Sequence, residues 1–495
     1  MRKKQTSTFS DLLLCHLLLF LSTSSCVRPI SLPQEILTGF SATPEPSTPP
    51  FQPLLADPTS VFALGFLRLD FSRLTLAVLH LPSSQPIWRA AFLPTNSPRW
   101  AAATHLSFNG SLLLSDSHSR PLWATPNTRA GNRLRLLNTS NLQIMDAGAV
   151  VWQSFDFPYD TLVENQNFTS QMTLRSSNGL YSMRATPGYL GLYSDFGGGT
   201  AQLYWKRTPL ETKAQIEEGQ GSIYARVEPD GFLGLYQTEK APLDVLAFAT
   251  YHRGVYGFRR LRLESDGNLR AEFWNSTAWV LDFEAIQETC NLPLACGGYG
   301  LCRPGKGCSC LDNRTEFSAS GDCSAPQSGD FCSNEGGRFW VIRRTGVDVP
   351  NKELMGFEKV GSAEECEDSC LRNCSCWGAV FGNVSGFCYR ISYPIQTMVG
   401  VGDESKVGFF KVRSGGEGKG EVGVGMVLLL SVGVAVVGVV VGFGVWFWRW
   451  KRRLERDGLG GEDGISPGPY RDLKQMLWTA SFRTDSFKSV ELCRR

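Results

Sequence analysis

The sequence predicts a mainly β extracellular protein with a disulfide-rich C-terminal part and a single transmembrane helix. Three observations predict this class. From about Val61 to Leu281, short β-type runs alternate with turn residues, without an amphipathic helix pattern. Twelve of the fifteen cysteines lie between Cys290 and Cys388, as in small secreted domains that rely on disulfides. A long apolar run, residues 422–448, follows them.

Residues 1–25 have the order of a secretory signal peptide. Basic residues at positions 2–4 precede an apolar stretch from Leu12 to Leu21, and small residues follow it. This stretch is too short to span a bilayer. We therefore expect the chain to enter a compartment in which disulfides form.

Residues 422–448 contain no charged side chain and predict a transmembrane helix. At about 1.5 Å per residue, a helix of this length exceeds the roughly 30 Å hydrocarbon core. Trp446, Trp448 and Trp450 lie at its end, and basic residues begin at Arg449. Aromatic residues at the interface and basic residues beyond it predict a cytoplasmic tail, residues 449–495. The expected protein is a type I single-pass plasma-membrane protein with its N-terminal part extracellular.

Seven Asn-x-Ser/Thr triplets without proline precede the apolar run, and none follows it. Such triplets are acceptors for N-glycosylation in secreted chains, so their distribution favours a glycosylated ectodomain. The seven expected sites are Asn109, Asn138, Asn167, Asn275, Asn313, Asn373 and Asn383.

A repeated seven-residue frame organises the β part of the ectodomain. Each copy has an apolar residue, then a two-residue turn, then a leucine two positions after it. The turns are Asn109-Gly110, Thr139-Ser140, Asp230-Gly231 and Asp266-Gly267. Two copies precede residue 165 and two follow it, which predicts two similar β domains in tandem; unrelated hairpins are the alternative. Residues from about 28 to 60, rich in Pro, Ser and Thr, are interpreted as an extended lead-in.

Three segments, Phe62–Phe66 (FALGF), Ile87-Trp88 and Trp152–Leu162 (WQSFDFPYDTL), resemble the bulb-type lectin domain of plant S-locus glycoproteins and S-receptor-like kinases. The region from Asp266 to Trp279 is similar to the S-locus glycoprotein segment of the same family. The resemblance implies tandem bulb-lectin-like β-prism domains. We place the bulb-type lectin domain at residues 40–165 and the second β domain at residues 166–285.

Six cysteines follow within residues 286–324, and their spacing alone leaves fifteen connectivities open. They resemble the EGF-like module of the same family. That resemblance implies the pairs Cys290–Cys302, Cys296–Cys308 and Cys310–Cys323.

Six more cysteines lie in residues 332–413, where the ladder C-x3-C-x3-C-x-C resembles a PAN/apple domain. The spacing of four between Cys366 and Cys370 would place both thiols on one helix face. The resemblance implies the pairs Cys366–Cys388 and Cys370–Cys376, and it leaves Cys332 for Cys374. A zinc site at Cys308-x-Cys310 or Cys374-x-Cys376 is the alternative, although zinc ligands are usually spaced by two to four residues.

Mannose-binding bulb lectins use a Gln-x-Asp-x-Asn-x-Val-x-Tyr strand, and its best match here is Leu137–Met145. Asn141 is retained, whereas the other four motif positions are occupied by Leu137, Thr139, Gln143 and Met145. Without the carboxylate, few strong hydrogen bonds to a sugar are left. We expect Asn141 to complete a turn, and no sugar-binding, cofactor-binding or metal-binding residues are assigned.

No catalytic constellation is evident. The five histidines, which are His16, His80, His105, His118 and His252, do not have metal-ligand spacing, and there is no G-x-S-x-G motif. Asp156 and Asp160 are expected to cap turns. Residues 449–495 contain none of the kinase motifs. We therefore expect neither an enzyme nor a cofactor.

The leading hypothesis is a non-enzymatic receptor-like protein or co-receptor whose ectodomain binds a protein or carbohydrate ligand. Its expected partner is a receptor kinase or a second copy of the chain. The alternative is a structural attachment protein between plasma membrane and cell-wall polysaccharide, and a hydrolase is a third hypothesis. No basic face is interleaved with aromatic residues, so nucleic acid is not an expected partner.

The first testable prediction concerns the disulfides. Each six-cysteine module should be closed within itself, because each count is even and the linker from Cys323 to Cys332 is short. Non-reducing peptide mapping of the full chain should recover the six pairs named above. A bridge between the two modules would contradict this prediction.

Overall fold

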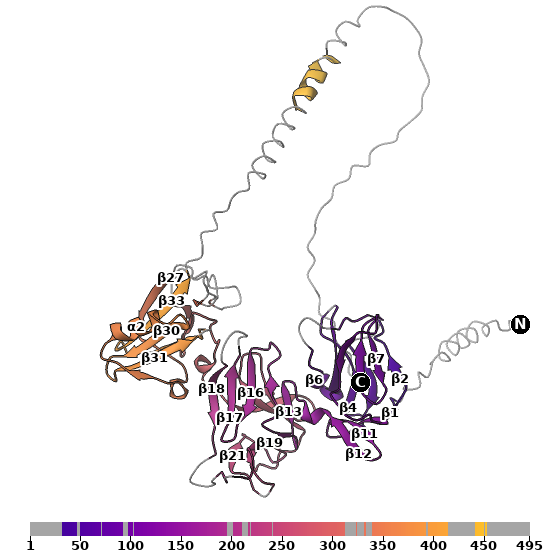
Figure 1. Cartoon of the computed structure of the whole chain (residues 1–495). Helices are drawn as coiled ribbons and strands as arrows, with labels where there is room; N and C mark the ends of the chain where they lie inside the picture. Colours follow the sequence, from indigo (N-terminus) through magenta and orange to yellow (C-terminus); the bar gives the residue numbers. More distant parts are fainter. Residues whose placement is uncertain are drawn as a thin grey trace, which may run out of the picture. The chain divides into compact units, whose positions relative to one another are not determined.

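The computed structural model describes residues 32–413, apart from short gaps, together with residues 441–449 and 451–452. The gaps are residues 47–49, 71, 93–97, 102, 196–200, 210–215, 218, 240, 312–322, 324–330, 333–338 and 393–394. The chain divides into two compact units, Met1–Gly416 and Glu417–Arg495. The described part of the first unit consists mainly of strands (Figure 1).

Twelve strands form the first β domain as three four-stranded antiparallel sheets. The first sheet has the order β1 (Glu35–Leu37), β10 (Arg133–Leu136), β11 (Leu142–Asp146) and β12 (Ala149–Gln153). The second has β2 (Phe40–Ala42), β7 (His105–Phe108), β8 (Leu112–Ser115) and β9 (Pro121–Ala124). The third has β3 (Phe51–Ala56), β4 (Phe62–Arg68), β5 (Leu74–His80) and β6 (Gln85–Arg89). Side chains from all three sheets share one core, which matches the β-prism that the resemblance implies.

The second β domain repeats this topology with every strand number raised by twelve. Its first sheet is β13 (Thr161–Val163), β22 (Arg259–Leu263), β23 (Leu269–Trp274) and β24 (Trp279–Glu284). The next is β14 (Asn167–Phe168), β19 (Tyr224–Glu228), β20 (Phe232–Tyr236) and β21 (Asp244–Ala247). The last is β15 (Leu174–Arg175), β16 (Tyr181–Ala185), β17 (Leu190–Ser194) and β18 (Gln202–Arg207).

The four repeated turns occupy equivalent hairpins of the two domains. They join β7 to β8 and β10 to β11 in the first domain, and β19 to β20 and β22 to β23 in the second. Their second residues are Gly110, Ser140, Gly231 and Gly267, all with φ between 69° and 92°. Tight hairpin turns require positive φ, which explains the residue types. The alternative of unrelated hairpins is wrong.

The interpretation of residues 28–60 as an extended lead-in is also wrong, because β1, β2 and β3 lie within it. The first two are three-residue strands at sheet edges. Such strands need few buried side chains, and in β1 only Ile36 is buried. Pro53 in β3 lies where the register shifts, at a position that tolerates a missing N–H donor. A polar, proline-rich composition is therefore compatible with these strands.

The WQSFDFPYDTL segment connects the two β domains. It contains the end of β12, the 3-10 helix η3 (Ser154–Asp156) and the start of β13. Asp160, in this segment, is buried. Its Oδ2 accepts a hydrogen bond from Arg89 Nη2 at 2.5 Å and lies 3.5 Å from Arg262 Nη2. The expectation that Asp160 caps a turn is therefore wrong. Its carboxylate joins β6 of the first domain to β22 of the second, because a buried charge needs partners.

Aromatic residues complete the contact between the two domains around His80. The His80 ring is 1% exposed. It lies 5.1 Å from the Trp274 ring, 5.4 Å from Trp279 and 5.9 Å from Phe258, all from the second domain. Ser83, in the 3-10 helix η1 (Leu81–Ser83), lies 2.8 Å from Nδ1 of His80.

The first six-cysteine module forms the disulfides Cys290–Cys302, Cys296–Cys308 and Cys310–Cys323. Its elements are η4 (Thr289–Asn291), β25 (Gly300–Arg303) and β26 (Gly307–Cys310). Since Cys308 and Cys310 are both bonded to other cysteines, neither offers a thiolate to zinc.

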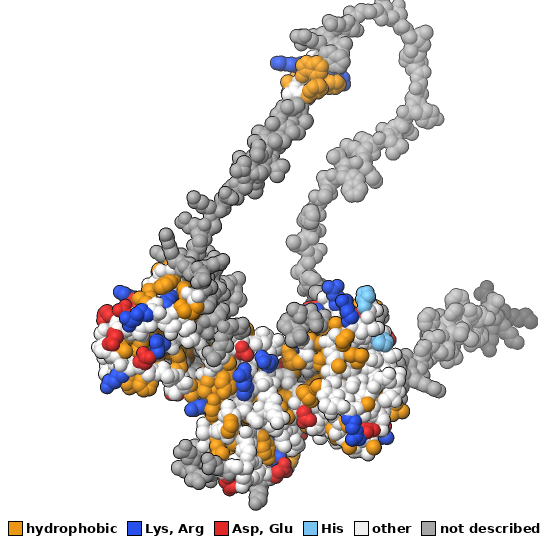
Figure 2. Space-filling view, viewed as in Figure 1, with side chains coloured by type: hydrophobic (Ala, Val, Ile, Leu, Met, Phe, Trp, Pro, Cys, Tyr) orange, Lys and Arg blue, Asp and Glu red, His pale blue; other side chains and the backbone are white. Residues whose placement is uncertain are grey.

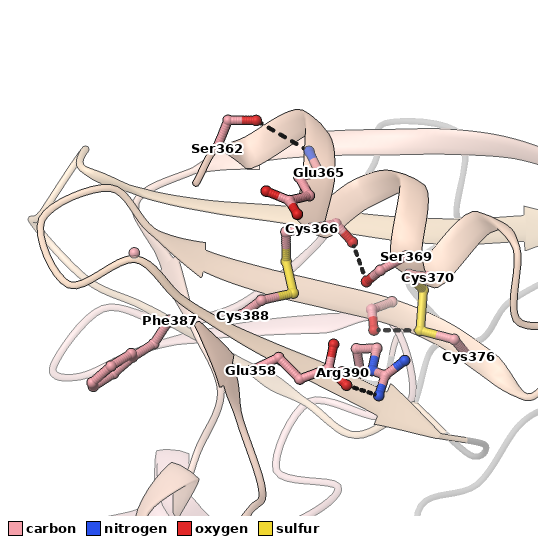
Figure 3. Close-up of a disulfide and its surroundings, with 12 residues drawn as sticks. Glu358, Ser362, Glu365, Cys366, Ser369, Cys370, Cys376, Phe387, Cys388 and Arg390 are labelled. Carbon is pink, nitrogen blue, oxygen red and sulfur yellow. Dashed lines mark hydrogen bonds and ion pairs between the residues drawn. A yellow bond between two sulfur atoms is a disulfide. The ribbon is translucent and has the colours of Figure 1, made fainter. Parts of the chain in front are cut away.

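The second module is a five-stranded sheet with one α-helix. The sheet has the order β27 (Phe339–Thr345), β33 (Lys406–Arg413), β30 (Cys376–Gly382), β31 (Phe387–Ser392) and β29 (Glu358–Lys359). The helix α2 (Ala363–Leu371) begins at Ser362, whose side chain accepts a hydrogen bond from the Glu365 N–H at 3.2 Å. Figure 3 shows the helix joined to the sheet by Cys366–Cys388 and Cys370–Cys376, and the third bridge is Cys332–Cys374. As predicted, α2 carries both Cys366 and Cys370.

A shared sheet unites the two modules although their disulfides are separate. Its order is β26, β25, β32 (Met398–Gly400) and β28 (Val347–Asp348), and β25 runs parallel to β32. The Tyr299 hydroxyl donates to the carbonyl of Lys411 at 2.6 Å, and the Cys296 N–H donates to Thr397 Oγ1 at 2.9 Å. Side chains of both modules also share one core. The expected division between residues 286–324 and 332–413 therefore separates two disulfide sets within one packed body.

In the second unit, residues 441–449 and 451–452 are helical. Most of the expected transmembrane segment, residues 422–448, lies outside the described residues. The expected signal peptide, residues 1–25, lies outside them entirely. Within the described residues, no helix has both the length and the apolar character needed to cross a membrane.

The second prediction concerns the stability of the two β domains at low pH. Burial, assisted by the charge of Arg260, lowers the pKa of His80 from 6.5 to about 4. Between these values the unfolded chain binds a proton that the folded chain does not, so stability should fall as pH decreases from about 6.5 to about 4. The expected loss is up to about 3 kcal/mol. Urea unfolding at pH 7 and at pH 4.5 measures it.

In this experiment, His80→Gln should weaken the pH dependence, whereas replacing the exposed His118 by Gln should leave it unchanged. Equal pH dependence in the wild-type chain and His80→Gln would contradict the assignment to His80.

Candidate functional site

The strand that corresponds to the mannose motif is β11 with the turn before it. Residues 137–141 form a tight turn in which the Leu137 N–H donates to the Asn141 carbonyl at 3.0 Å. Asn141 is buried, and its Nδ2 donates to Gln153 Oε1 at 2.9 Å. Its Oδ1 accepts hydrogen bonds from Ser154 Oγ at 3.3 Å and from the Phe155 N–H at 3.4 Å. Asn141 therefore has the expected structural role, and it also ties the turn to β12 and η3.

The neighbouring polar side chains are used in the same way. Gln143 Oε1 accepts hydrogen bonds from Arg135 Nε at 3.2 Å and from Nη2 at 3.0 Å. Gln143 Nε2 donates to Gln153 Oε1 at 3.3 Å, and Gln153 Nε2 donates to Asp156 Oδ1 at 3.0 Å. The row from Arg135 to Asp156 thus forms one chain of side-chain hydrogen bonds. A sugar hydroxyl would have to displace bonds that already exist.

The remaining motif positions offer little to a sugar. Met145 is buried and has no hydroxyl. Leu137 and Thr139 replace the glutamine and the carboxylate, and Asp146, the next carboxylate along the strand, pairs with Arg129 Nη2 at 2.5 Å. The absence of sugar-binding residues on this strand stays a prediction.

The described residues contain no group of three or more His, Cys, Asp or Glu side chains suited to a metal ion. The contact between His80 and Ser83 is covered by aromatic rings. With the pKa of His80 lowered to about 4 by burial, this histidine is a poor base near neutral pH.

Six of the seven expected glycosylation sites lie within the described residues, and all six asparagines are exposed. They are Asn109, Asn138, Asn167, Asn275, Asn373 and Asn383. Asn313 lies outside the described residues. On the face that Figure 2 shows, Lys and Arg are scattered among other side chains and do not form one basic stripe.

Sequence reasoning missed a hollow in the second module. The hollow has a volume of about 340 Å³ and lies beside the hairpin of β30 and β31. Phe387 and Tyr389 line it on one side, and Asp348, Lys352 and Lys406 contribute charged groups. These residues lie up to 58 positions apart, so no local sequence pattern connects them.

Comparison with known proteins identifies the parts of this architecture. The family model for D-mannose binding lectins matches residues 94–184. The S-locus glycoprotein domain matches residues 238–315, and the PAN-like domain matches residues 332–388. A PAN domain-containing protein of Arabidopsis thaliana is 47% identical over 487 residues, which cover 98% of this chain and 97% of that protein. This chain belongs to the same family.

Receptor kinases share a part of the same architecture. Two G-type lectin S-receptor-like serine/threonine-protein kinases of Arabidopsis thaliana are 26% and 27% identical over 67% of this chain. The aligned regions span 43% and 44% of those kinases, less than half of their length.

Two solved lectin structures are also similar to parts of the chain. The Japanese Marasmius oreades lectin is 19% identical, covers 26% of this chain and 92% of its own, and has a TM-score of 0.19. The two-domain Scilla campanulata agglutinin is 15% identical, covers 49% of this chain and 98% of its own, and has a TM-score of 0.20. TM-scores this low carry no structural argument.

The third prediction tests the mannose motif by restoring it. The wild-type chain should pass through immobilised mannose, because the polar side chains of β11 are already bonded to one another. A variant with Leu137→Gln, Thr139→Asp, Gln143→Val and Met145→Tyr regains the motif and should be retained, then released by free mannose. Equal retention of the wild-type chain and this variant would contradict the prediction.

Proposed function

We propose that this chain is a non-enzymatic receptor-like glycoprotein of the plasma membrane. Its ectodomain binds a protein or carbohydrate ligand, and its single transmembrane helix, residues 422–448, leads to a short cytoplasmic tail. The observation that carries the proposal is the order of the ectodomain parts. Two β domains of one topology precede two disulfide-bonded modules, and 67% of the chain aligns with a G-type lectin S-receptor-like kinase.

The proposed partner is a receptor kinase, which a second copy of the chain could join. A ligand outside the cell alters the cytosol through one helix only if it changes the association or orientation of that helix. Residues 449–495 contain none of the kinase motifs. Association with a kinase would supply a catalytic output that these residues do not supply.

The expected transmembrane segment contains a sequence feature suited to helix association. Gly438 and Gly442 form a Gly-x3-Gly motif, which lets two helices approach closely. Gly433 and Gly444 add small residues nearby. These positions provide a specific target for mutation.

The fourth prediction is that the full chain co-purifies with a kinase from plant membranes under mild detergent. Replacing both Gly438 and Gly442 by Ile should reduce the recovered kinase, because two bulky side chains keep the helices apart. Val441→Ile is the matched control, because it enlarges a neighbouring residue and keeps both glycines. Recovery is measured by quantitative mass spectrometry.

A wild-type chain that runs as a lone monomer and recovers no kinase would overturn the co-receptor proposal. Attachment of the membrane to wall polysaccharide would then replace it. Binding of the full chain to insoluble cell-wall glycans, independent of any kinase, would support that outcome.

A further inference from the structure

The hollow in the PAN region exists because one face of its sheet is incompletely covered. The helix α2 packs on one face, where Cys366 is bonded to Cys388 of β31. On the opposite face, side chains of the EGF-like module pack against Val380 and Ile391. Next to the turn between β30 and β31, Gly382 contributes no side chain, and the hollow of about 340 Å³ opens there. Its volume lies near the lower end of the range of small-ligand sites, about 300–1,000 Å³.

Aromatic rings form one wall of this hollow. Phe387 and Tyr389 line it, and Figure 3 shows Phe387 pointing away from α2. Phe357, just before β29, stacks against both, with ring centroids 4.2 Å from Phe387 and 5.8 Å from Tyr389. Phe357 is nevertheless 53% exposed. An exposed aromatic cluster next to a hollow offers a flat surface to a ligand.

Charged groups held in place also line the hollow. Asp348 is 6% exposed, accepts a hydrogen bond from Lys352 Nζ at 2.6 Å, and accepts another from Lys406. Asp403 accepts hydrogen bonds from the Ser405 N–H at 3.0 Å and from its hydroxyl at 2.6 Å. Burial alone would raise the pKa of Asp348, but the bonds from the two lysines outweigh burial and lower it. The carboxylate therefore stays ionised near neutral pH.

The charged residues that line the hollow are two acids and two lysines, so their formal charges cancel and they favour neither an anion nor a cation. They are Asp348, Asp403, Lys352 and Lys406. Together they place hydrogen-bond acceptors beside donors. Hydroxyl groups match such a pattern, because each can donate and accept. The aromatic wall matches the C–H face of a sugar ring, since the negative face of an aromatic ring attracts weakly positive hydrogens.

We propose that this hollow binds one pyranose ring of a neutral glycan. The ring stacks against Phe387 and Tyr389, the two aromatic residues that line the hollow, and its hydroxyls bond to the Lys352, Lys406 and Asp403 side chains. This site differs from the mannose motif on β11. It also does not depend on the proposed kinase partner, so either proposal can fail without the other.

Two sources could supply the sugar ring. One is a glycan outside the chain, and the other is the N-glycan expected on Asn383. Asn383 is exposed in the turn at the rim of the hollow, and its N–H donates to the Ser405 carbonyl at 3.0 Å. Its neighbours Gly382, Val384 and Ser385 all line the hollow. The experiment must therefore compare chains with and without this glycan.

The probe is methyl β-D-glucopyranoside, whose equatorial hydroxyls leave both ring faces with exposed C–H groups. Binding to the full-length chain is measured by saturation-transfer NMR and by titration. Phe387→Ala and Tyr389→Ala should each weaken binding about two- to tenfold, the range expected for loss of one stacking contact. Tyr256→Ala is the matched control, because Tyr256 is an aromatic residue of the second β domain that is 91% exposed. It should leave binding unchanged.

The Asn383→Gln variant distinguishes the sources. Equal binding by the wild-type chain and Asn383→Gln would identify an external glycan as the ligand. Binding that occurs only in Asn383→Gln would show that the chain's own glycan fills the hollow. Absence of binding in both would overturn the proposal, as would equal binding by the wild-type chain and the Phe387→Ala variant. Recovery of the Cys366–Cys388 peptide checks that each variant is folded.

Discussion

The buried carboxylate of Asp160 is the constraint on which the arrangement of the β part depends. An ionised group in the interior is tolerated only when charged partners surround it. Here Arg89 comes from the first β domain and Arg262 from the second. The aromatic cluster around His80 adds apolar contacts between the same two domains. One charge in the connecting segment therefore requires both domains to pack, whereas a flexible linker would leave them independent.

The sequence predicted those features that are set by local chemistry. Three of the four hairpin turns have a glycine, which tolerates positive φ, and the spacing of four between Cys366 and Cys370 fits one face of α2. The six disulfides join the pairs that the family resemblance implies. Spacing alone could not select them, because many connectivities satisfy the same chain lengths.

The features that the sequence did not predict depend on contacts between distant residues. The pairing of β25 with β32 joins Leu301 to Met398, and no local pattern marks it. The three-residue edge strands β1 and β2 are too short for an alternating pattern to stand out. The hollow depends on Gly382, where a side chain is missing, and on a lysine from each of two distant segments. For the candidate site, the sequence thus indicated that the mannose motif is incomplete. It did not indicate the hollow where another ligand could bind.

The lectin strand and the PAN hollow differ in how their polar groups are satisfied. On β11 and in the turn before it, the side-chain amides of Asn141 and Gln143 are already bonded to neighbouring side chains, and little remains for a hydroxyl to recognise. In the hollow, two ammonium groups share Asp348 and keep further N–H donors, since each ammonium carries three. Asp403 is exposed and retains acceptor capacity beyond its bonds to Ser405.

The bonds within the body that contains the hollow limit how the chain could respond to a ligand. The hollow belongs to a body held by six disulfides and one shared core. A body so tightly connected has little freedom to change its internal structure when a small ring binds. Binding there would alter which surface the body presents, and with it the preference for one partner over another. We therefore propose that recognition in this chain controls association, which is also the form of signalling that the proposed single transmembrane helix would permit.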